Sequence, residues 1–572
     1  MLLQRDGDSW IGTVSDGAVY GLVADGDGAR FDPSKVLLDP QALEVWFSPD
    51  HDRWLAAERG ASNAGRGPMA VARRTPAARP SRRSTRPPVV YELHVRGMTT
   101  RAGGPHPGTF GALVEQLPRL AALGVTVIEL LPVHQNDPAE GSYWGYMPLA
   151  FGAVQHDYAA NGDAAADLAA FVAAAHDHDI EVWLDVVFNH TTEVDAAGPT
   201  YAFRGLSDGS YYRLRDDGSY IETTGCGNDV DAESPVVQDL VLWSLERLAD
   251  LGVDGFRFDL AVVLGRSATL VERIERLAHE RELTLVAEPW DAAGTYQLGR
   301  SWPGRGWLQW NDRFREDARG FLRGEPGMLA ALRQRVQGSP DLFDNPMESV
   351  NFVACHDGFT LYDVVAHDHK HNEDNGWSGA DGASENRSWN CGWEGDDGVP
   401  DEVLALRRRQ LRNAWCLLAL SHGVPMAGMG DELGRTQGGN NNAYNQDNET
   451  SWVDWDRANE FTDLERFVSA VLAVRARHPV LAQPTFWGDA VRFSEPDAEG
   501  RALTWQVGDL YVLANAWWEP VDVALEEPGP WRRVVDTSLD PPEDIVDRFS
   551  GLGVATTYRV AARSMVVLER PG

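Results

Sequence analysis

Three acidic side chains each follow an apolar segment with strand character. Asp259 ends the segment GFRFD, Glu288 follows LTLVA, and Asp357 follows VNFVACH. The first segment also carries Arg257, and the period of two in a strand directs Arg257 and Asp259 to the same face. A buried strand would normally be apolar at both positions. Three acids at three strand ends therefore indicate one shared active site.

Two of these carboxyls suit the chemistry of a retaining glycosidase. Such an enzyme needs an ionised nucleophile and a protonated acid about 5 to 5.5 Å apart. Arg257 would lower the pKa of Asp259, because a nearby cation favours the charged form of a carboxyl. Glu288 has apolar neighbours, among them Trp290, and such surroundings raise the pKa of a carboxyl. We therefore expect Asp259 to be the nucleophile and Glu288 the general acid.

Each of these residues also has a simpler explanation when it is taken alone. An Asp at a strand end often caps a helix, and a single His is more often structural than catalytic. Their joint occurrence at the ends of the third, fourth, fifth and seventh expected strands favours a shared site. At such a site Asp357 could hold sugar hydroxyls and select a distorted ring, while His190 and His356 could donate hydrogen bonds to other hydroxyls.

The segments that position these residues predict a (β/α)8 barrel. Between residues 88 and 478, apolar strand-like runs alternate with amphipathic helical stretches such as DEVLALRRRQLRNAWCLLAL. Catalytic residues of such barrels lie at the C-terminal ends of the strands, which is where the acids fall. The eight expected strands are 89–95, 125–133, 181–189, 255–261, 283–289, 306–310, 349–355 and 424–430.

Smaller β domains are expected on both sides of the barrel. Residues 1–87 predict a small β domain, which ends in a Pro- and Arg-rich linker from about residue 60 that is either solvated or docked on an acidic surface. We favour this linker over an anion site. Residues 479–572 alternate as in a β-sandwich. After the third strand, residues 191–234 are too many for an ordinary loop and predict a small excursion beside the active site.

The composition limits the classes of partner. The formal charge of −35 disfavours nucleic acid and anionic membranes, and no segment approaches the roughly 20 apolar residues of a membrane helix. Four cysteines in 572 residues give no disulfide framework, and the N-terminus lacks the pattern of a signal peptide. We therefore expect a cytoplasmic protein. The 21 tryptophans suit either core packing or stacking on sugar rings.

Four segments together resemble the conserved regions of glycoside hydrolase family 13, the α-amylase superfamily. They are DVVFNH (185–190), GFRFD (255–259), AEPW (287–290) and ACHDG (354–358), in the family's order. The resemblance implies that Asp259 is the nucleophile, Glu288 the acid/base and Asp357 the transition-state stabiliser. It also implies a substrate site that contains Arg257, His190 and His356 and the stacking aromatic Tyr146 of YWGY. We further expect Trp144 and Trp290 to bind substrate.

Longer motifs narrow the resemblance to the glycogen debranching and isoamylase branch of this family. They include YELHVRGMT, TGCGNDVD, WNDRFREDARGFL, KHNEDNG, SWNCGWEG and GNNNAYNQDNETSW. This branch hydrolyses α-1,6 linkages in branched α-glucans and carries an N-terminal carbohydrate-binding-like module. Here that module is shortened, the loop VHQNDPAEGS is compressed, and AGMGDE replaces the usual AGDE. These departures affect the length of glucan branch that the enzyme would prefer and its oligomeric state, and the sequence supports no prediction for either.

Other functions stay open at the level of the sequence. Within the family, the alternatives are a hydrolase that acts on α-1,4 linkages or releases trehalose, and a transglycosylase. The alternative that is not an enzyme is a glucan-binding relative that has lost its activity. No cofactor or metal is expected. Asp185, Asn189 and Asp229 could contribute to a calcium site of the kind found in α-amylases, but calcium prefers six to eight ligands, so hydrogen bonding is the favoured role. Likewise Cys226 and Cys355 are expected to pack rather than react.

Overall fold

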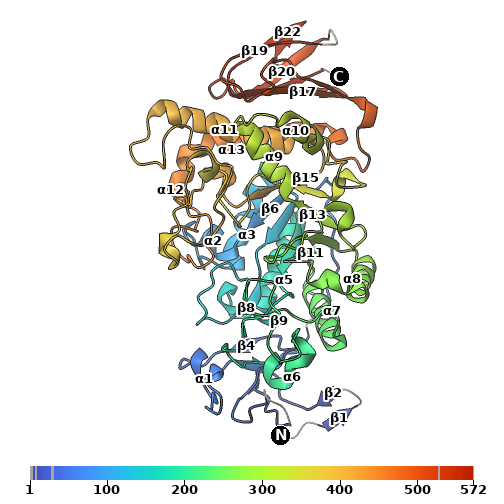
Figure 1. Cartoon of the computed structure of the whole chain (residues 1–572), viewed down its shortest axis with the longest axis vertical. Coiled ribbons are helices and arrows are strands. Elements are labelled where there is room, and N and C mark those ends of the chain that lie inside the picture. Colours follow the sequence, from blue (N-terminus) through green and yellow to red (C-terminus); the bar gives the residue numbers. More distant parts are fainter. Residues whose placement is uncertain (1–3, 7–8, 27–30, 76, 526–528, 571–572) are drawn as a thin grey trace.

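A computed structural model describes residues 4–6, 9–26, 31–75, 77–525 and 529–570 of the chain. Its centre is a closed barrel of eight parallel strands, flanked along the long axis by small β structures (Figure 1). All eight strands predicted from the sequence are confirmed. They are β6 (Val90–Leu93), β7 (Val127–Leu130), β10 (Glu181–Val186), β11 (Gly255–Phe258), β12 (Thr284–Ala287), β13 (Leu308–Asn311), β14 (Ser349–Asn351) and β15 (Val424–Gly428).

Helices connect most of the barrel strands. The connection from β12 to β13, residues 288–307, is different, because it contains only a 3₁₀ turn at Gly299–Ser301. The helices around the barrel are α2 (Val95–Thr99), α3 (Phe110–Val114), α4 (Leu117–Leu123), α5 (Ala164–Asp177), α6 (Phe203–Tyr211), α7 (Pro235–Ala249), α8 (Ala268–Arg281), α9 (Asp312–Leu322), α10 (Leu329–Val336), α11 (Asp401–Ala419), α12 (Trp455–Ala458) and α13 (Thr462–Arg477).

The barrel interior changes from apolar to charged along the strands. An apolar cluster that includes Val127 and Trp183 fills one layer. Two residues further along the same strands, Glu129 and Asp185 are buried as well, as the period of two requires. Strand pairing sets Glu92 opposite Glu129 and Asp185 opposite Arg257. Four charged side chains thus form a layer at the end of the barrel toward which the acids project.

Two features between β7 and α7 surround the barrel opening. A hairpin of β8 (His134–Asn136) and β9 (Pro148–Val154) follows β7, although the sequence patterns did not predict it. Residues 191–234, the expected excursion, contain α6 and several loops. Arg53 connects both features to the N-terminal part, because it pairs with Asp137 at 2.6 Å and donates to the Thr192 carbonyl at 3.0 Å.

The N-terminal part contains two small sheets. β1 (Gln4–Asp6) pairs with β2 (Ser9–Ile11), and β5 (Met69–Val71) lies between β3 (Val19–Tyr20) and β4 (Val45–Trp46), near the short helix α1 (Arg53–Ala57). The expected linker from residue 60 was therefore wrong for Met69–Val71, which pair as the central strand. Residues 1–3, 7–8, 27–30 and 76 of the expected N-terminal module and linker lie outside the described residues.

The arginine-rich segment docks on acidic residues at the N-terminal end of the barrel. Of the two expectations for it, docking on an acidic surface is the one that the structure agrees with. The backbone N–H of Arg82 donates to Asp254 at 2.6 Å, and that of Ser84 donates to Glu181 at 2.9 Å. Thr85 donates to Asp179 through its hydroxyl at 2.7 Å. These bonds attach the N-terminal part to the barrel wall.

The C-terminal part is antiparallel. It has a six-stranded sheet and a separate two-stranded sheet (red in Figure 1), with a small apolar cluster that includes Trp531 and Leu568. The strands are β16 (Val491–Ser494), β17 (Ala502–Val507), β18 (Leu510–Asn515), β19 (Val521–Ala524), β20 (Trp531–Asp536), β21 (Leu552–Val554), β22 (Thr557–Val560) and β23 (Ser564–Glu569).

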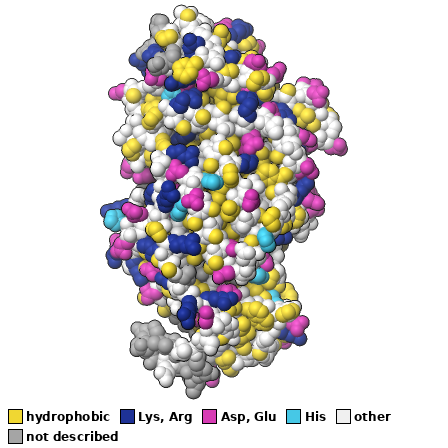
Figure 2. All heavy atoms as spheres, turned by 180° about the vertical axis from the view of Figure 1, so that it is seen from behind, with side chains coloured by type: hydrophobic (Ala, Val, Ile, Leu, Met, Phe, Trp, Pro, Cys, Tyr) yellow, Lys and Arg dark blue, Asp and Glu magenta, His cyan; other side chains and the backbone are white. Residues whose placement is uncertain are grey.

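Charges of both signs are interspersed on the face shown in Figure 2, where Lys and Arg alternate with Asp and Glu over the length of the molecule. Among the helices that the structure describes, none combines the length and the apolar character needed to cross a membrane.

Candidate active site

Arg257 is the centre of the site. It lies on β11, is 1% exposed, and its guanidinium contacts three carboxylates. The distances are 2.7 Å to Asp185, 3.1 Å to Asp259 and 3.0 Å to Glu288. One cation among three acids leaves a local excess of negative charge. The planar fork of Arg suits this arrangement, because it can donate in several directions from a fixed position.

Asp259 follows the last residue of β11. One carboxylate oxygen accepts from Arg257, and the other accepts from the side-chain amide of Asn189 at 2.8 Å. The same amide donates to the Asp259 carbonyl at 2.8 Å. Hydrogen bonds from donors stabilise the ionised form of a carboxyl. The two oxygens of Asp259 are therefore fixed in orientation by two different donors.

Glu288 follows β12 and is 7% exposed. Its carboxyl accepts from the Leu260 backbone N–H at 2.8 Å. Burial raises the pKa of Glu288 to about 8; Arg257 opposes the shift, whereas the nearby charge of Asp259 adds to it. Glu288 is therefore protonated at neutral pH. Asp259 was expected to be charged and Glu288 neutral. The burial of Glu288 and the Arg257 guanidinium that both carboxyls share account for this difference.

Asp357 and His356 lie after β14. The Asp357 side chain is exposed, and its carboxylate makes no hydrogen bond within the described part of the chain. Its charge contributes to the raised pKa of Glu288, so the two lie near each other. His356 Nδ1 pairs with Glu92 at 2.6 Å. Burial would lower the pKa of His356, but the Glu92 carboxylate outweighs burial and raises it.

An aromatic wall lies next to the acids. The Tyr146 ring stacks on the His356 ring at 5.0 Å, and the Trp144 ring meets His356 edge-on at 4.9 Å. The Tyr146 hydroxyl donates to Asp185 at 2.6 Å. His190 is 1% exposed, and its two ring nitrogens contact the Tyr146 carbonyl and the Asn189 side chain. In this structure His190 therefore contacts residues that position the acids.

The remaining sequence-predicted residues lie around this group. Trp290, two residues after Glu288, lies with its ring 6.4 Å from that of Tyr296 and packs against the apolar cluster of the barrel interior. Cys355 is buried and packs with the barrel interior. Cys226 is half-buried, and burial raises the pKa of both thiols. Neutral thiols fit the packing role expected for them.

The sequence analysis missed Glu92, Glu129 and Trp310. Trp310 lies under Arg257, with the guanidinium carbon 4.2 Å from the ring centroid, a distance typical of a cation–π contact. Glu129 is 1% exposed, and neither carboxyl oxygen has a hydrogen-bond partner. Burial raises its pKa well above the usual range, with a further contribution from Asp185. A signal was present, because Glu92 and Glu129 interrupt apolar strands as Arg257 does.

The residues weighed as calcium ligands have other partners. Asp185 accepts from Arg257 and Tyr146, and Asn189 donates to Asp259. Asp229 accepts from Arg266 at 2.6 Å and from the Thr223 hydroxyl at 2.8 Å. The hydrogen-bonding role predicted for these three residues is confirmed. Burial raises the pKa of Asp185 to about 6.

Sequence comparison relates the chain to glucan-processing proteins. Residues 71–215 match the α-amylase catalytic domain family. The chain is 37% identical to a glycogen debranching enzyme of Dickeya chrysanthemi, and the match covers 100% of this chain and 93% of the relative. It is 36% identical to isoamylase 3 of rice over 99% of this chain and 79% of the relative. A glycogen operon protein GlgX homolog of Mycobacterium bovis is 38% identical over 84% of this chain and 76% of its own.

Solved structures share the fold. A pullulanase from Bacillus acidopullulyticus has a TM-score of 0.72 at 24% identity and covers 93% of this chain and 66% of its own. A type I pullulanase from Bacillus subtilis has a TM-score of 0.74 at 22% identity, with 94% and 75% covered. With the order of the four conserved segments and the relatives above, these findings show that the chain belongs to the isoamylase and glycogen debranching branch of glycoside hydrolase family 13.

Proposed function

We propose that this protein hydrolyses the α-1,6-glucosidic branch linkages of glycogen or a similar α-glucan, with net retention of configuration. The observation that carries the linkage specificity is the similarity over nearly the whole chain to a protein named as a glycogen debranching enzyme. The pair of a charged Asp259 and a neutral Glu288 beside one Arg supports the retaining chemistry.

In the first step the Glu288 carboxyl gives its proton to the oxygen of the branch linkage while Asp259 attacks the anomeric carbon. The bond between that carbon and the branch oxygen breaks, and a glycosyl ester forms on Asp259. In the second step Glu288 takes a proton from water, and the resulting nucleophile displaces Asp259. The protonation state of Glu288 at neutral pH suits the first step, because an acid works best when its pKa lies near the operating pH.

The other site residues are assigned to the sugar at the cleaved bond. The exposed Asp357 carboxylate and the Nε2 of His356, which make no hydrogen bond within the described residues, are available to its hydroxyls. Tyr146 offers a ring face, with Trp144 and Trp290 as further aromatic contacts. His190 orients Tyr146 and Asn189. Arg257 holds both carboxyls in place.

We extend the proposal to the flanking parts and the location. Residues 1–87 are assigned as a shortened carbohydrate-binding-type module with its linker, 88–478 as the catalytic barrel, and 479–572 as a β-sandwich. The four cysteines, all free, support a cytoplasmic location.

Products from four glucans test the linkage. Amylopectin or glycogen should be debranched, so that iodine absorbance of amylopectin rises as linear chains are released, and linear amylose should stay nearly intact. Pullulan, an unbranched chain of maltotriose units joined by α-1,6 linkages, shows whether an α-1,6 linkage is cleaved when it is not a branch point. A rapid fall of iodine absorbance with maltose or glucose release would contradict the proposal in favour of α-1,4 hydrolysis. Release of trehalose from maltooligosyltrehalose, without debranching, would contradict it in favour of a trehalohydrolase.

A further inference from the structure

Two histidines and a glutamate meet outside the active site, in the long connection from β14 to α11. His367 Nδ1 and His371 Nε2 each lie 3.2 Å from the same oxygen of Glu394. The three ligand atoms lie within 4.8 Å of one another. His371 and Glu394 come from the motifs KHNEDNG and SWNCGWEG, to which the glycosidase chemistry assigns no role.

We propose that His367, His371 and Glu394 bind one divalent transition-metal cation of the zinc type. Zinc takes His nitrogens at about 2.0–2.1 Å and carboxylate oxygens at about 2.0–2.2 Å in a tetrahedron, whose ligand atoms are then about 3.3 Å apart. The two observed nitrogen–oxygen distances match that separation. Two His and one Glu also form a ligand set that zinc uses with water in the fourth position.

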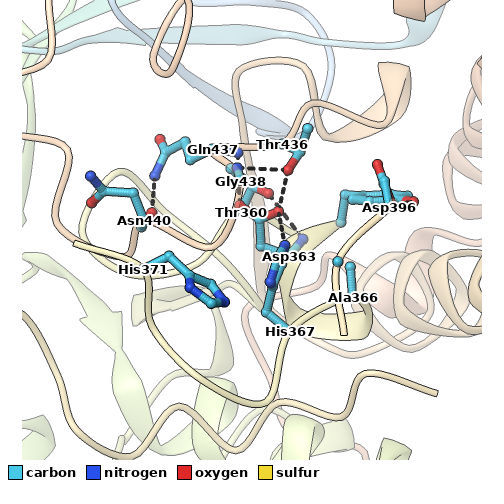
Figure 3. Close-up of polar contacts among 12 residues, drawn as sticks. Thr360, Asp363, Ala366, His367, His371, Asp396, Thr436, Gln437, Gly438 and Asn440 are labelled. Carbon is cyan, nitrogen blue, oxygen red and sulfur yellow. Dashed lines mark hydrogen bonds and ion pairs between the residues drawn. The ribbon is translucent and has the colours of Figure 1, made fainter. Parts of the chain in front are cut away.

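The ring of His367 has a carboxylate behind it. Its Nε2 lies 3.8 Å from the Asp363 carboxylate, and Figure 3 shows the His367 ring beside Asp363, with the His371 ring nearby. Asp363 is itself fixed, because it accepts from the hydroxyl of Thr436 and from the backbone N–H of Gln437 at 2.8 Å. At 3.8 Å the Asp363 carboxylate is too distant to accept a hydrogen bond from the ring, but it adds a negative charge behind the proposed cation site.

The side chain of Arg407 holds together the two backbone segments that carry the site, before any ion binds. Arg407 of α11 is fully buried and donates to the carbonyls of Ala366, at 3.3 Å, and Gly395, at 3.0 Å. These two carbonyls adjoin His367 and Glu394. Gly439 closes the other side, where a Cβ would lie 2.5 Å from the His371 ring and 2.8 Å from His367 Nδ1. Only glycine permits this approach of the rings to the backbone.

The site is open to solvent on one side. The His371 side chain is 44% exposed and that of Glu394 is 32% exposed, whereas that of His367 is 7% exposed. An ion can therefore enter past His371 and keep a water ligand. Bound there, it would cross-link two parts of the connection that follows Asp357. It would act on the stability of this connection and take no part in glycoside cleavage.

Isothermal titration of the chelator-treated, desalted full-length protein with ZnCl₂ tests the site. The wild type should bind one Zn²⁺ through these residues, and His371→Gln and His367→Gln should weaken binding at least about tenfold, since changes even behind the ligands cost 10- to 100-fold. His369→Gln is the matched control, because its exposed side chain lies in the same segment outside the group. Co²⁺ should give the visible absorption of a tetrahedral site in the wild type and in His369→Gln only.

Three results would overturn the proposal: no Zn²⁺ binding by the wild type, equal binding by the wild type and His371→Gln, or equal loss in His369→Gln. The first two would mean that the histidines serve only as hydrogen-bond donors to Glu394. Because His371 is largely exposed, His371→Gln keeps the test valid if the buried His367→Gln fails to fold, and circular dichroism checks each variant.

Discussion

At the scale of single residues, the site depends on crowding three carboxyls around one guanidinium. Arg257 contacts Asp185, Asp259 and Glu288, so it cannot neutralise all three. The cost of burial and of like charge falls on Glu288, whose pKa rises to about 8. Besides the bond from Arg257, the Asp259 carboxylate accepts one further bond, from Asn189. The same neighbouring residues thus favour Glu288 as the acid and Asp259 as the nucleophile.

The pH dependence of kcat/KM should follow from this separation. Glu288 acts while protonated, so we expect kcat/KM to fall as pH rises through about 8. Initial rates on amylopectin between pH 4 and pH 10 measure the profile. An alkaline fall centred near pH 5 would contradict the buried, protonated state of Glu288.

The raised pKa of Glu288 also predicts a stability effect. Between the usual pKa of a free glutamate and about 8, the folded protein keeps a proton that the unfolded chain has lost, so stability falls as pH rises across this window. Glu288→Gln stays neutral and should escape this fall. Its melting temperature should exceed that of the wild type by a margin that grows from pH 5 to pH 8 and then levels off. A constant margin over that range would disprove the link to ionisation.

At the scale of elements, the alternation of inward and outward positions along a strand explains which residues of the active site could be predicted from the sequence. Inward positions of a strand recur every two residues, so Arg257 and Asp259 were visible as polar exceptions in an apolar run. The barrel strands themselves were found as continuous apolar runs, as expected for buried parallel strands, and the acids as charged residues at their ends. Glu92 and Glu129 carry the same signal but do not end their strands. The strand Pro148–Val154 is as fully buried as the predicted strand Glu181–Val186. It was missed because its Pro and Gly are unfavourable within strands.

Other groups of polar residues, inside and outside the active site, depend on contacts between distant segments. The group of His367, His371 and Glu394 forms because Arg407 holds two carbonyls that are 29 residues apart in sequence (395 minus 366). No spacing rule contains this information. Likewise, the partners of His190 come from the fold, since only the structure brings the Tyr146 carbonyl to its ring.

The turn at Gly145 should be essential for the aromatic wall. Gly145 has φ +93°, and a Cβ there would lie 2.7 Å from the Pro132 carbonyl oxygen, so Gly145→Ala must shift Trp144 and Tyr146. We expect kcat/KM on amylopectin to drop about tenfold or more. Gly141→Ala is the matched control, with φ +82° but no atom within 4 Å of the added Cβ. It bears only the strain of about 1–2 kcal/mol for this conformation. Equal activity of both variants would show that the turn is not needed.

At the scale of the whole molecule, the C-terminal sheets and the barrel are joined by a buried polar contact. Asn413 of α11 donates to the Arg563 carbonyl at 2.9 Å and accepts from the Thr537 hydroxyl at 2.6 Å. Asn413 is 3% exposed and Thr537 is fully buried. Amphipathic strands alone predicted a sandwich, but not this contact, which needs two partners from different parts of the chain.

Asn413→Ala should destabilise the protein by about 1–3 kcal/mol, because it removes two buried hydrogen bonds. The Thr537 hydroxyl loses its acceptor, and the Arg563 carbonyl keeps only the long bond from Gln410 at 3.4 Å. A lower midpoint in thermal or urea unfolding measures the effect. Asn459→Ala, which removes an exposed side chain, should stay within about 0.5 kcal/mol of the wild type. Equal midpoints for Asn413→Ala and the control would mean that the barrel does not depend on this contact.

The division of labour between Asp259 and Glu288 is the central claim, and trapping with an α-maltotriosyl fluoride tests it most directly. Acid catalysis typically contributes about 10² to 10⁴-fold, so Glu288→Gln should lose glucan hydrolysis. Fluoride leaves without much help from an acid, so the same variant should still form the glycosyl ester on Asp259, detectable by mass spectrometry. Asp259→Ala should fail with both substrates. Equal loss of glucan and fluoride turnover in the two variants, with no trapped ester in either, would contradict the separate roles of these carboxyls.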